Sequence, residues 1–236
     1  MKRQRALALV LFGLLHLAWS PFPMAKAGVP FLSALLNRAE LVRGAGPSPL
    51  AGQVPLGIGL ADFVLGIAIL GMIYALISFA RVPENATPIC AFERYGVPIL
   101  ALAGLGVAGY LSYVELSGTE AFCGPVGGCN VVQASRYAKL FGVVPLGLFG
   151  ASGYLLVLIS AAASLSRWDV LTKPARLAVF AEALLGTAFS AYLTYLEIFV
   201  LRAACIWCLT SALLITFILA ISARPAASSL VTEAGT

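Results

Sequence analysis

Charged side chains are scarce in this sequence, and their scarcity excludes the ordinary soluble classes of protein. Asp, Glu, Lys and Arg make up 11% of the 236 residues, whereas hydrophobic residues make up 61%. The mean hydropathy is +0.97. Soluble globular domains carry about 25% charged residues. The composition therefore predicts a membrane protein with several spans.

Basic residues and histidine are also few. The net charge is only +5, and no Lys/Arg cluster is dense enough to follow a phosphate backbone, which excludes nucleic-acid binding. We interpret the positive charge as a determinant of membrane orientation and as contact with anionic lipid headgroups. The single histidine, His16, lies in an apolar run. We therefore expect no metal site and no histidine-based catalysis.

The first 55 residues read as an export signal followed by a linker. Three basic residues among the first five precede the apolar run Ala6–Trp19, and Ala25-Lys26-Ala27 has the A-x-A pattern of a cleavage site. Residues 1–27 are thus predicted to be a signal peptide or an uncleaved signal anchor. Residues 28–55, rich in Pro and Gly, are predicted to be an exported linker.

Five later stretches are long and apolar enough to cross a bilayer. They are Leu56–Ala80, Gly96–Leu116, Val143–Leu165, Leu177–Leu201 and Cys205–Ser222. We expect the first to be an extra helix that precedes a four-helix bundle over residues 96–222. Residues 223–236 are expected to form a cytoplasmic tail.

The connection at residues 166–176 sets the predicted topology. It carries Arg167, Lys173 and Arg176 against one Asp, so the positive-inside rule places it in the cytoplasm. The loop at residues 117–142 is then exported. Residues 81–95 are cytoplasmic, where Cys90 is expected to remain a free thiol.

Four cysteines fall on the exported, oxidising side in two pairs. Cys123 and Cys129 are separated by five residues, and Cys205-Ile206-Trp207-Cys208 is a CxxC motif that opens the last helix. Two thiols at the first turn of a helix lie close enough to form a disulfide. The helix N-terminus and Arg202 are expected to favour the thiolate of Cys205, the nucleophile of thiol–disulfide exchange.

A short motif is repeated at an offset of 82 residues. Tyr110-Leu-Ser-Tyr113-Val-Glu115 ends one helix, Tyr192-Leu-Thr-Tyr195-Leu-Glu197 ends another, and the same offset relates Cys123 to Cys205. Duplication of a helix pair and chance similarity of two apolar helices both remain open. We expect Glu115 and Glu197 to be solvated near the headgroups, and the deeper Glu182 to be neutral or hydrogen-bonded.

The segment after Cys123 is expected to be a movable arm followed by a short helix. Four Gly and Pro residues lie between the two thiols, which disfavours regular structure. Asn130 is expected to cap a helix over Val131–Phe141 that ends at Gly142. We expect this half-helix to lie horizontally over a cavity between the four spans.

These features together resemble the vitamin K epoxide reductase family. The resemblance rests on the C-x5-C pair, Ser135 six residues after its second cysteine, the Gly142-Val-Val-Pro145 sequence before the next span, and the CxxC that opens the last helix. It covers about residues 96–222. Asn130 stands where many bacterial members have an acidic residue.

The resemblance implies an all-α bundle of four helices around a quinone, such as menaquinone or ubiquinone. It implies two redox-active disulfides, Cys123–Cys129 and Cys205–Cys208. Electrons would pass from an exported thioredoxin-fold (DsbA-like) partner to the first disulfide, then to the second, and then to quinone beside Cys208. Ser135 and Trp207 are candidate quinone-binding residues. The implied location is a bacterial plasma membrane. Because the chain ends shortly after the last span, we expect the partner to act in trans.

Three other hypotheses remain. The cysteines could form inert structural disulfides in a transporter or scaffold. A zinc site of four thiolates is disfavoured by the oxidising location and by the lack of nearby carboxylates. The bacterial thiol oxidase DsbB gives the same reaction, but it has its CxxC in the first exported loop and its spaced pair in the second, the reverse of the order seen here.

Overall fold

Five long helices dominate the computed structural model, which describes residues 55–81, 91–124, 128–140, 143–166 and 169–231. The helices are α4 (Pro55–Ala80), α5 (Ala91–Ser117), α7 (Leu146–Ser164), α8 (Asp169–Leu196) and α9 (Ile206–Val231). Each is long and apolar enough to cross a membrane. The predicted all-α integral membrane fold is confirmed. The predicted export signal, nearly all of the linker, and Cys90 lie outside the described residues.

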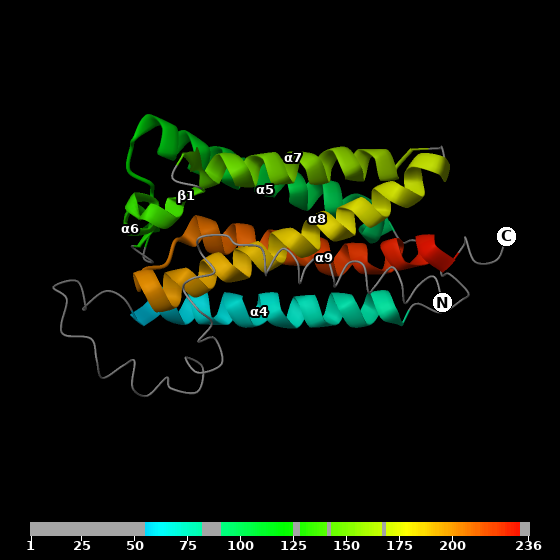
Figure 1. Cartoon of the computed structure of the whole chain (residues 1–236), viewed down its shortest axis with the longest axis horizontal. Coiled ribbons are helices and arrows are strands. Elements are labelled where there is room, and N and C mark those ends of the chain that lie inside the picture. Colours follow the sequence, from blue (N-terminus) through cyan, green and yellow to red (C-terminus); the bar gives the residue numbers. More distant parts are fainter. Residues whose placement is uncertain (1–54, 82–90, 125–127, 141–142, 167–168, 232–236) are drawn as a thin grey trace. The chain divides into compact units, whose positions relative to one another are not determined.

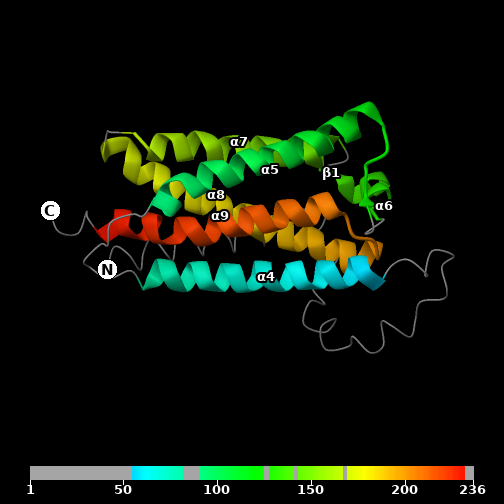
Figure 2. The ribbon, with the colours of Figure 1, turned by 180° about the vertical axis from the view of Figure 1, so that it is seen from behind.

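Helix α9 packs against α4, α5 and α8, while α7 packs against α5 and α8. Both views place α4 on one side of the α8–α9 layer and α5 and α7 on the other (Figures 1 and 2). Small residues allow the close approach of α4: Ala61, Ala68 and Ala75 recur every seven residues and are at most 1% exposed. Small residues at one face of a span let helix backbones pack closely in lipid. The extra helix is therefore an integral part of the bundle.

The loop between α5 and α7 differs from its prediction. Its helix, α6, covers Cys129–Ala134, and it is followed by a 3₁₀ turn, η2 (Arg136–Ala138), and by the paired strands β1 (Lys139–Leu140) and β2 (Val144–Pro145). The predicted helix over 131–141 is wrong because Ser135 is extended and its Oγ donates a hydrogen bond to the Val132 carbonyl at 2.7 Å, which ends α6.

Three helices extend beyond the apolar stretches that predicted them. Helix α5 begins at Ala91, α8 begins at Asp169 within the predicted cytoplasmic connection, and α9 continues to Val231 into the predicted tail. Hydropathy marks where a segment ceases to be apolar, but helical hydrogen bonding can continue through polar residues at the membrane surface.

Candidate functional site

The four predicted cysteines lie together at one end of the bundle. Cys129 and Cys205 are 0% exposed and share a cluster with Val114 and Ala121. The other two thiols, with Tyr110 and Trp207, pack against this cluster and are half-buried. All four cysteines are free thiols in the structure. The fold thus brings together two cysteine pairs that are far apart in the sequence.

The four thiols form a continuous series of side-chain contacts. Cys123 contacts Cys129, Cys129 contacts Cys205, and Cys205 contacts Cys208. Exchange between a thiolate and a disulfide requires that the attacking sulfur reach the sulfur under attack. Each step along this series joins neighbouring groups, including the step between the two pairs.

A close approach of two backbones brings Cys129 to Cys205. A Cβ atom added to Gly128 would lie 2.6 Å from the carbonyl oxygen and 2.7 Å from the nitrogen of Ala204. Only glycine fits there, directly before one cysteine and against the residue that precedes the other. Gly128 is buried, so the predicted movable arm is held at this end. Residues 125–127 lie outside the described residues.

Two aromatic side chains hold the segment that carries Cys123. The Phe122 N–H donates to the Tyr110 hydroxyl at 3.0 Å, and the Phe122 carbonyl accepts from Trp207 Nε1 at 2.8 Å. The rings of Tyr110 and Trp207 pack with their centroids 4.5 Å apart. Trp207, which lies between the cysteines of the CxxC motif, therefore bonds directly to the segment of the other pair.

Asn130 contributes a further bond to the same segment. Its Oδ1 accepts from the Ala121 N–H at 2.8 Å, so the predicted role as the cap of α6 is wrong. Gly128 takes the N-cap position, with no side-chain hydrogen bond there. Asn130 ties α6 back to the chain just before Cys123.

Glu197 is the residue whose place the sequence reasoning missed. It is only 3% exposed, its Oε2 accepts from the Cys205 N–H at 3.1 Å, and its side chain contacts the Cys208 thiol. It begins the π-helical turn η3 (Glu197–Leu201), which ends at Arg202 with a positive φ of 51°. The predicted solvation of Glu197 is wrong because this turn directs the carboxyl group toward the CxxC motif.

The repeated motif carried a signal for this inward position. Glu115, at the matching place in the first copy, is half-buried, and its Oε2 accepts from the Gly147 N–H at 2.8 Å. Both glutamates thus accept a backbone N–H bond near the start of a following helix. The two environments differ. Among the described interactions of these two glutamates, only those of Glu197 include a thiol.

The thiols outside the spans are held in their protonated forms. Contact with the Cys205 thiol and burial raise the pKa of Cys129. Contact with Cys129 lowers the pKa of Cys205, but contact with Cys208 and burial outweigh it, so this pKa is raised as well. The prediction that the helix N-terminus and Arg202 favour the Cys205 thiolate is wrong, since the thiol is buried and Arg202 is exposed.

Other predicted residues have simpler surroundings. Ser135 is hydrogen-bonded to Val132 within its own turn, so its quinone-binding role stays a prediction. The predicted hydrogen bond of Glu182 is confirmed, since Ser160 Oγ donates to its Oε1 at 2.9 Å. In the part of the chain that the structure describes, no group of three or more His, Cys, Asp or Glu residues is arranged to hold a metal ion.

Comparison with known families agrees with the resemblance noted in the sequence. The model of the vitamin K epoxide reductase family matches residues 97–223. The match covers more than half of the chain and includes all four cysteines of the cluster, Glu197, and the helices α7 and α8 in full.

Proposed function

Because the chain belongs to the vitamin K epoxide reductase family, we propose that it is a membrane thiol oxidase that passes electrons from exported proteins to a quinone. The observation that carries this proposal is the unbroken series of contacts from Cys123 through Cys129 and Cys205 to Cys208. Such a series supports transfer of two electrons by successive thiol–disulfide exchanges.

Electron transfer would begin at the outer pair. A reduced partner with two thiols attacks the Cys123–Cys129 disulfide and leaves as a disulfide, so the pair gains two electrons and two protons. Cys129 then attacks Cys205 and breaks the Cys205–Cys208 disulfide, forming a Cys129–Cys205 bond. Cys123 attacks Cys129 in turn, which restores the first disulfide and leaves Cys205 and Cys208 as thiols.

The surroundings of Cys208 fit a quinone acceptor. Tyr110, Val114 and Trp207 belong to or pack against the cluster that contains the CxxC motif, and they provide aromatic and apolar contacts suited to a ring. A bound quinone would accept two electrons and two protons as Cys205 and Cys208 return to a disulfide. Cys208 is the thiol proposed to face it, and Trp207 and Ser135 remain candidate quinone contacts.

The proposed partner is an exported thioredoxin-fold oxidase of the DsbA type that acts in trans. Phe122 is 77% exposed next to Cys123, and Gly124 after it is also exposed. An exposed aromatic residue beside a half-buried thiol is suited to a protein partner. The basic residues of the 166–176 segment favour a cytoplasmic position for the opposite end of the bundle, which leaves the cysteines on the exported side of a bacterial plasma membrane.

Quinone reduction by the purified full-length protein tests this function. The assay supplies a reduced thioredoxin-fold oxidase and a menaquinone or ubiquinone analogue, and follows quinone absorbance. We expect turnover in the native protein, none above background in Cys208→Ala, and full turnover in Cys90→Ala. Unchanged turnover in Cys208→Ala, or disulfides that resist mild reductant in the native protein, would contradict the proposal and favour structural bridges.

A further inference from the structure

Glu197 is a buried carboxyl group next to the last thiol of the series. Its side chain is 3% exposed and contacts the Cys208 thiol, while its Oε2 also accepts the Cys205 N–H bond at 3.1 Å. One carboxyl group is thereby fixed against both ends of the CxxC motif. A carboxyl group that is removed from water and held by a backbone donor exchanges its proton mainly with the groups next to it.

The backbone around Glu197 holds the carboxyl group at this place. The Arg202 N–H donates to the Glu197 carbonyl and closes the π-helical turn, and the Ala203 N–H donates to the same carbonyl at 3.1 Å. Ile198, the next residue, is buried in a cluster with Ala61 and Val64 of α4 and Ala204. Extra turns of this kind within helices are frequent at functional sites. The extra helix α4 thus supports the turn that directs Glu197 to the cysteines.

We propose that Glu197 is the proton donor and acceptor for Cys208, an assignment that rests on the proposed thiol oxidase function. When Cys129 attacks Cys205, the Cys205–Cys208 bond breaks and the Cys208 sulfur leaves with the electron pair. The Glu197 carboxylic acid gives its proton to that sulfur and becomes a carboxylate. During reoxidation the Cys208 thiol returns the proton to Glu197, and its sulfur becomes the electron donor. Glu197 itself is neither oxidised nor reduced.

Other titratable groups lie on the elements next to Glu197. The elements packed against η3 or bonded to it carry Asp62 of α4, Cys129 of α6, Tyr195 of α8, the exposed Arg202, and Cys205 and Cys208. A test must therefore change Glu197 and leave these groups in place. Glu197→Gln does so, because the amide oxygen of glutamine can still accept the Cys205 N–H bond although it cannot exchange a proton.

The experiment follows the reduction of each disulfide separately in oxidised, quinone-free protein. Dithiothreitol is added, samples are quenched with an alkylating reagent, and each cysteine pair is read by mass spectrometry. In Glu197→Gln we expect Cys205–Cys208 to be reduced about 100-fold more slowly than in the native protein, the lower range for loss of a general acid. Reduction of Cys123–Cys129 should be unchanged, which also shows that the variant is folded.

The pH profile separates proton transfer from a merely structural role. We expect the difference between native protein and Glu197→Gln to shrink as the pH rises, because only the acid form of Glu197 can give a proton, whereas a merely structural effect would be the same at every pH. Glu197→Asp should recover part of the native rate. Glu115→Gln is the matched control, since Glu115 holds the equivalent place in the repeat without a thiol contact, and it should behave as the native protein.

Each alternative outcome is distinct. A Cys205–Cys208 disulfide that dithiothreitol does not reduce even in the native protein would overturn the proposed function as a whole. Equal rates for the native protein and Glu197→Gln, or a difference that stays constant with pH, would overturn the role of Glu197 while leaving the relay of thiols intact.

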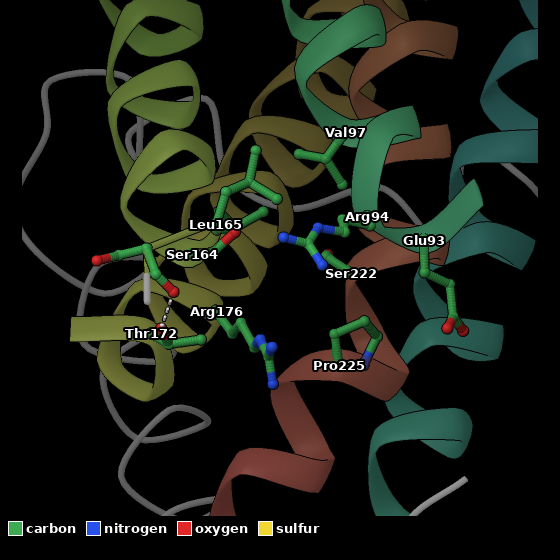
Figure 3. Close-up of a pocket in the computed structure, with 11 residues that line it drawn as sticks. Glu93, Arg94, Val97, Ser164, Leu165, Thr172, Arg176, Ser222 and Pro225 are labelled. Atoms are coloured by element: carbon green, nitrogen blue, oxygen red, sulfur yellow. Dashed lines mark hydrogen bonds between the residues drawn. The ribbon is translucent and has the colours of Figure 1, made fainter. Parts of the chain in front are cut away.

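A second observation, independent of the cysteines, concerns the other end of the bundle. A pocket of about 220 Å³ lies where α5 and α8 begin and where α7 and α9 end. Figure 3 shows the guanidinium groups of Arg94 and Arg176 turned toward the same hollow. Glu93 also lines the pocket, but its carboxylate points away and lies 3.6 Å from Arg224. Ser164 and Thr172 add hydroxyl groups to the lining.

The geometry points to a site for the phosphate of an anionic phospholipid headgroup. Arginine binds phosphate oxygens through paired N–H donors, and basic pockets between spans on the cytoplasmic side bind such headgroups. This end carries the basic residues that predict a cytoplasmic position. The neighbouring surface of α5 is apolar, with Phe92 and Ile99 well over half exposed, so lipid chains can lie beside the pocket.

Thermal unfolding of the detergent-purified protein tests the lipid site. Phosphatidylglycerol should raise Tm more than phosphatidylcholine does, and Arg94→Gln with Arg176→Gln should abolish the difference. Arg94→Gln alone should reduce the difference in Tm between the two lipids. This single variant keeps the test valid if the double variant does not fold. The charge-matched control, Arg136→Gln with Lys139→Gln at the cysteine end, should keep the difference. Equal shifts with both lipids, a shift kept in the double variant, or an equal shift with inorganic phosphate alone would overturn the proposal.

Discussion

The two segments that carry the cysteines are held in opposite ways. Residues 121 and 122, directly before Cys123, are fixed through their backbone by side chains of other elements, Tyr110, Asn130 and Trp207, and Phe122 is exposed. The CxxC motif opens the long helix α9, and the Cys205 N–H donates to the buried Glu197. Neutral hydrogen bonds at a wet surface are worth about 0.5–1.5 kcal/mol each. The first segment can therefore leave its position at a small cost in free energy, whereas the CxxC motif cannot move without disrupting α9.

In the proposed function, this difference lets one pair meet a protein partner while the other stays beside the membrane. The two inner thiols of the series, Cys129 and Cys205, are fully buried and in contact, and the thiols at its two ends, Cys123 and Cys208, are half-buried. Of these two ends, only Cys123 lies in the segment with the weaker attachment.

Removing an inner thiol should have the largest effect. Cys129→Ser should lower quinone reduction by at least about 10³-fold, because a hydroxyl group cannot replace a thiol in disulfide exchange. The Cys123 thiolate should still attack the disulfide of an oxidised partner and form a mixed disulfide, with the partner's second cysteine leaving as a thiol, which gel analysis after acid quenching detects. A variant that keeps a tenth of native turnover would show that electrons bypass Cys129.

Separating the two segments without removing a thiol should have the next largest effect. Gly128→Val places a side chain against Ala204, where even a Cβ atom would lie 2.6 Å from the carbonyl oxygen. Displacement of a reacting group by about 1 Å can cost about 100-fold in rate. We expect turnover to fall by about 10- to 100-fold, with all five thiols of the chain still present by titration.

Gly109→Ala provides the control for that variant. A Cβ atom at Gly109, on an exposed face of α5, has no neighbour within 4 Å. Turnover and Tm should match the native protein. Equal activities of the Gly128 and Gly109 variants would show that the close approach of the two backbones is not needed for transfer.

The accessible thiol should ionise less readily than an ordinary cysteine. Burial, and then contact with Cys129, raise the pKa of Cys123. Less thiolate is therefore present at any pH below that pKa, so alkylation of Cys123 in the reduced protein should be slower than that of free cysteine at pH 8. The rate should still rise about tenfold per pH unit where free cysteine levels off. Cys129→Ala should bring the alkylation rate of Cys123 closer to that of free cysteine. A rate equal to that of free cysteine in the native protein would contradict the prediction.

Loosening the outer segment should have the smallest effect. Trp207→Phe keeps a ring against Tyr110 but removes the bond from Nε1 to the Phe122 carbonyl. Loss of about 0.5–1.5 kcal/mol corresponds to a two- to tenfold faster reaction of Cys123 with a maleimide at fixed pH. Tyr113→Phe, at an exposed position of α5, should leave that rate unchanged. A slower reaction in Trp207→Phe would show that the indole exposes the thiol rather than restrains it.

Much of the bundle was predictable because membrane spans leave a strong signal. Runs of apolar residues had to lie in lipid, and all five predicted spans correspond to helices. Helix ends were less predictable: α8 begins at Asp169, since polar residues can continue a helix at the membrane surface. The length of the loop helix was predicted wrongly because the Ser135 hydroxyl donates a hydrogen bond to the Val132 carbonyl, which ends α6. Composition does not reveal such competition between a side chain and the helical backbone bonds.

The sequence alone determined that this is a helical membrane protein with four cysteines in two spaced pairs, because hydropathy and motif spacing are properties of neighbouring residues. Only the tertiary structure decided that Cys129 meets Cys205 and that Glu197 faces Cys208 instead of water. Those contacts depend on a glycine at a backbone crossing and on the rotation of one helix by a π-helical turn. Both are set by packing between segments far apart in the chain, so the sequence carries only an indirect sign of them, the repeated motif that matches Glu197 with Glu115.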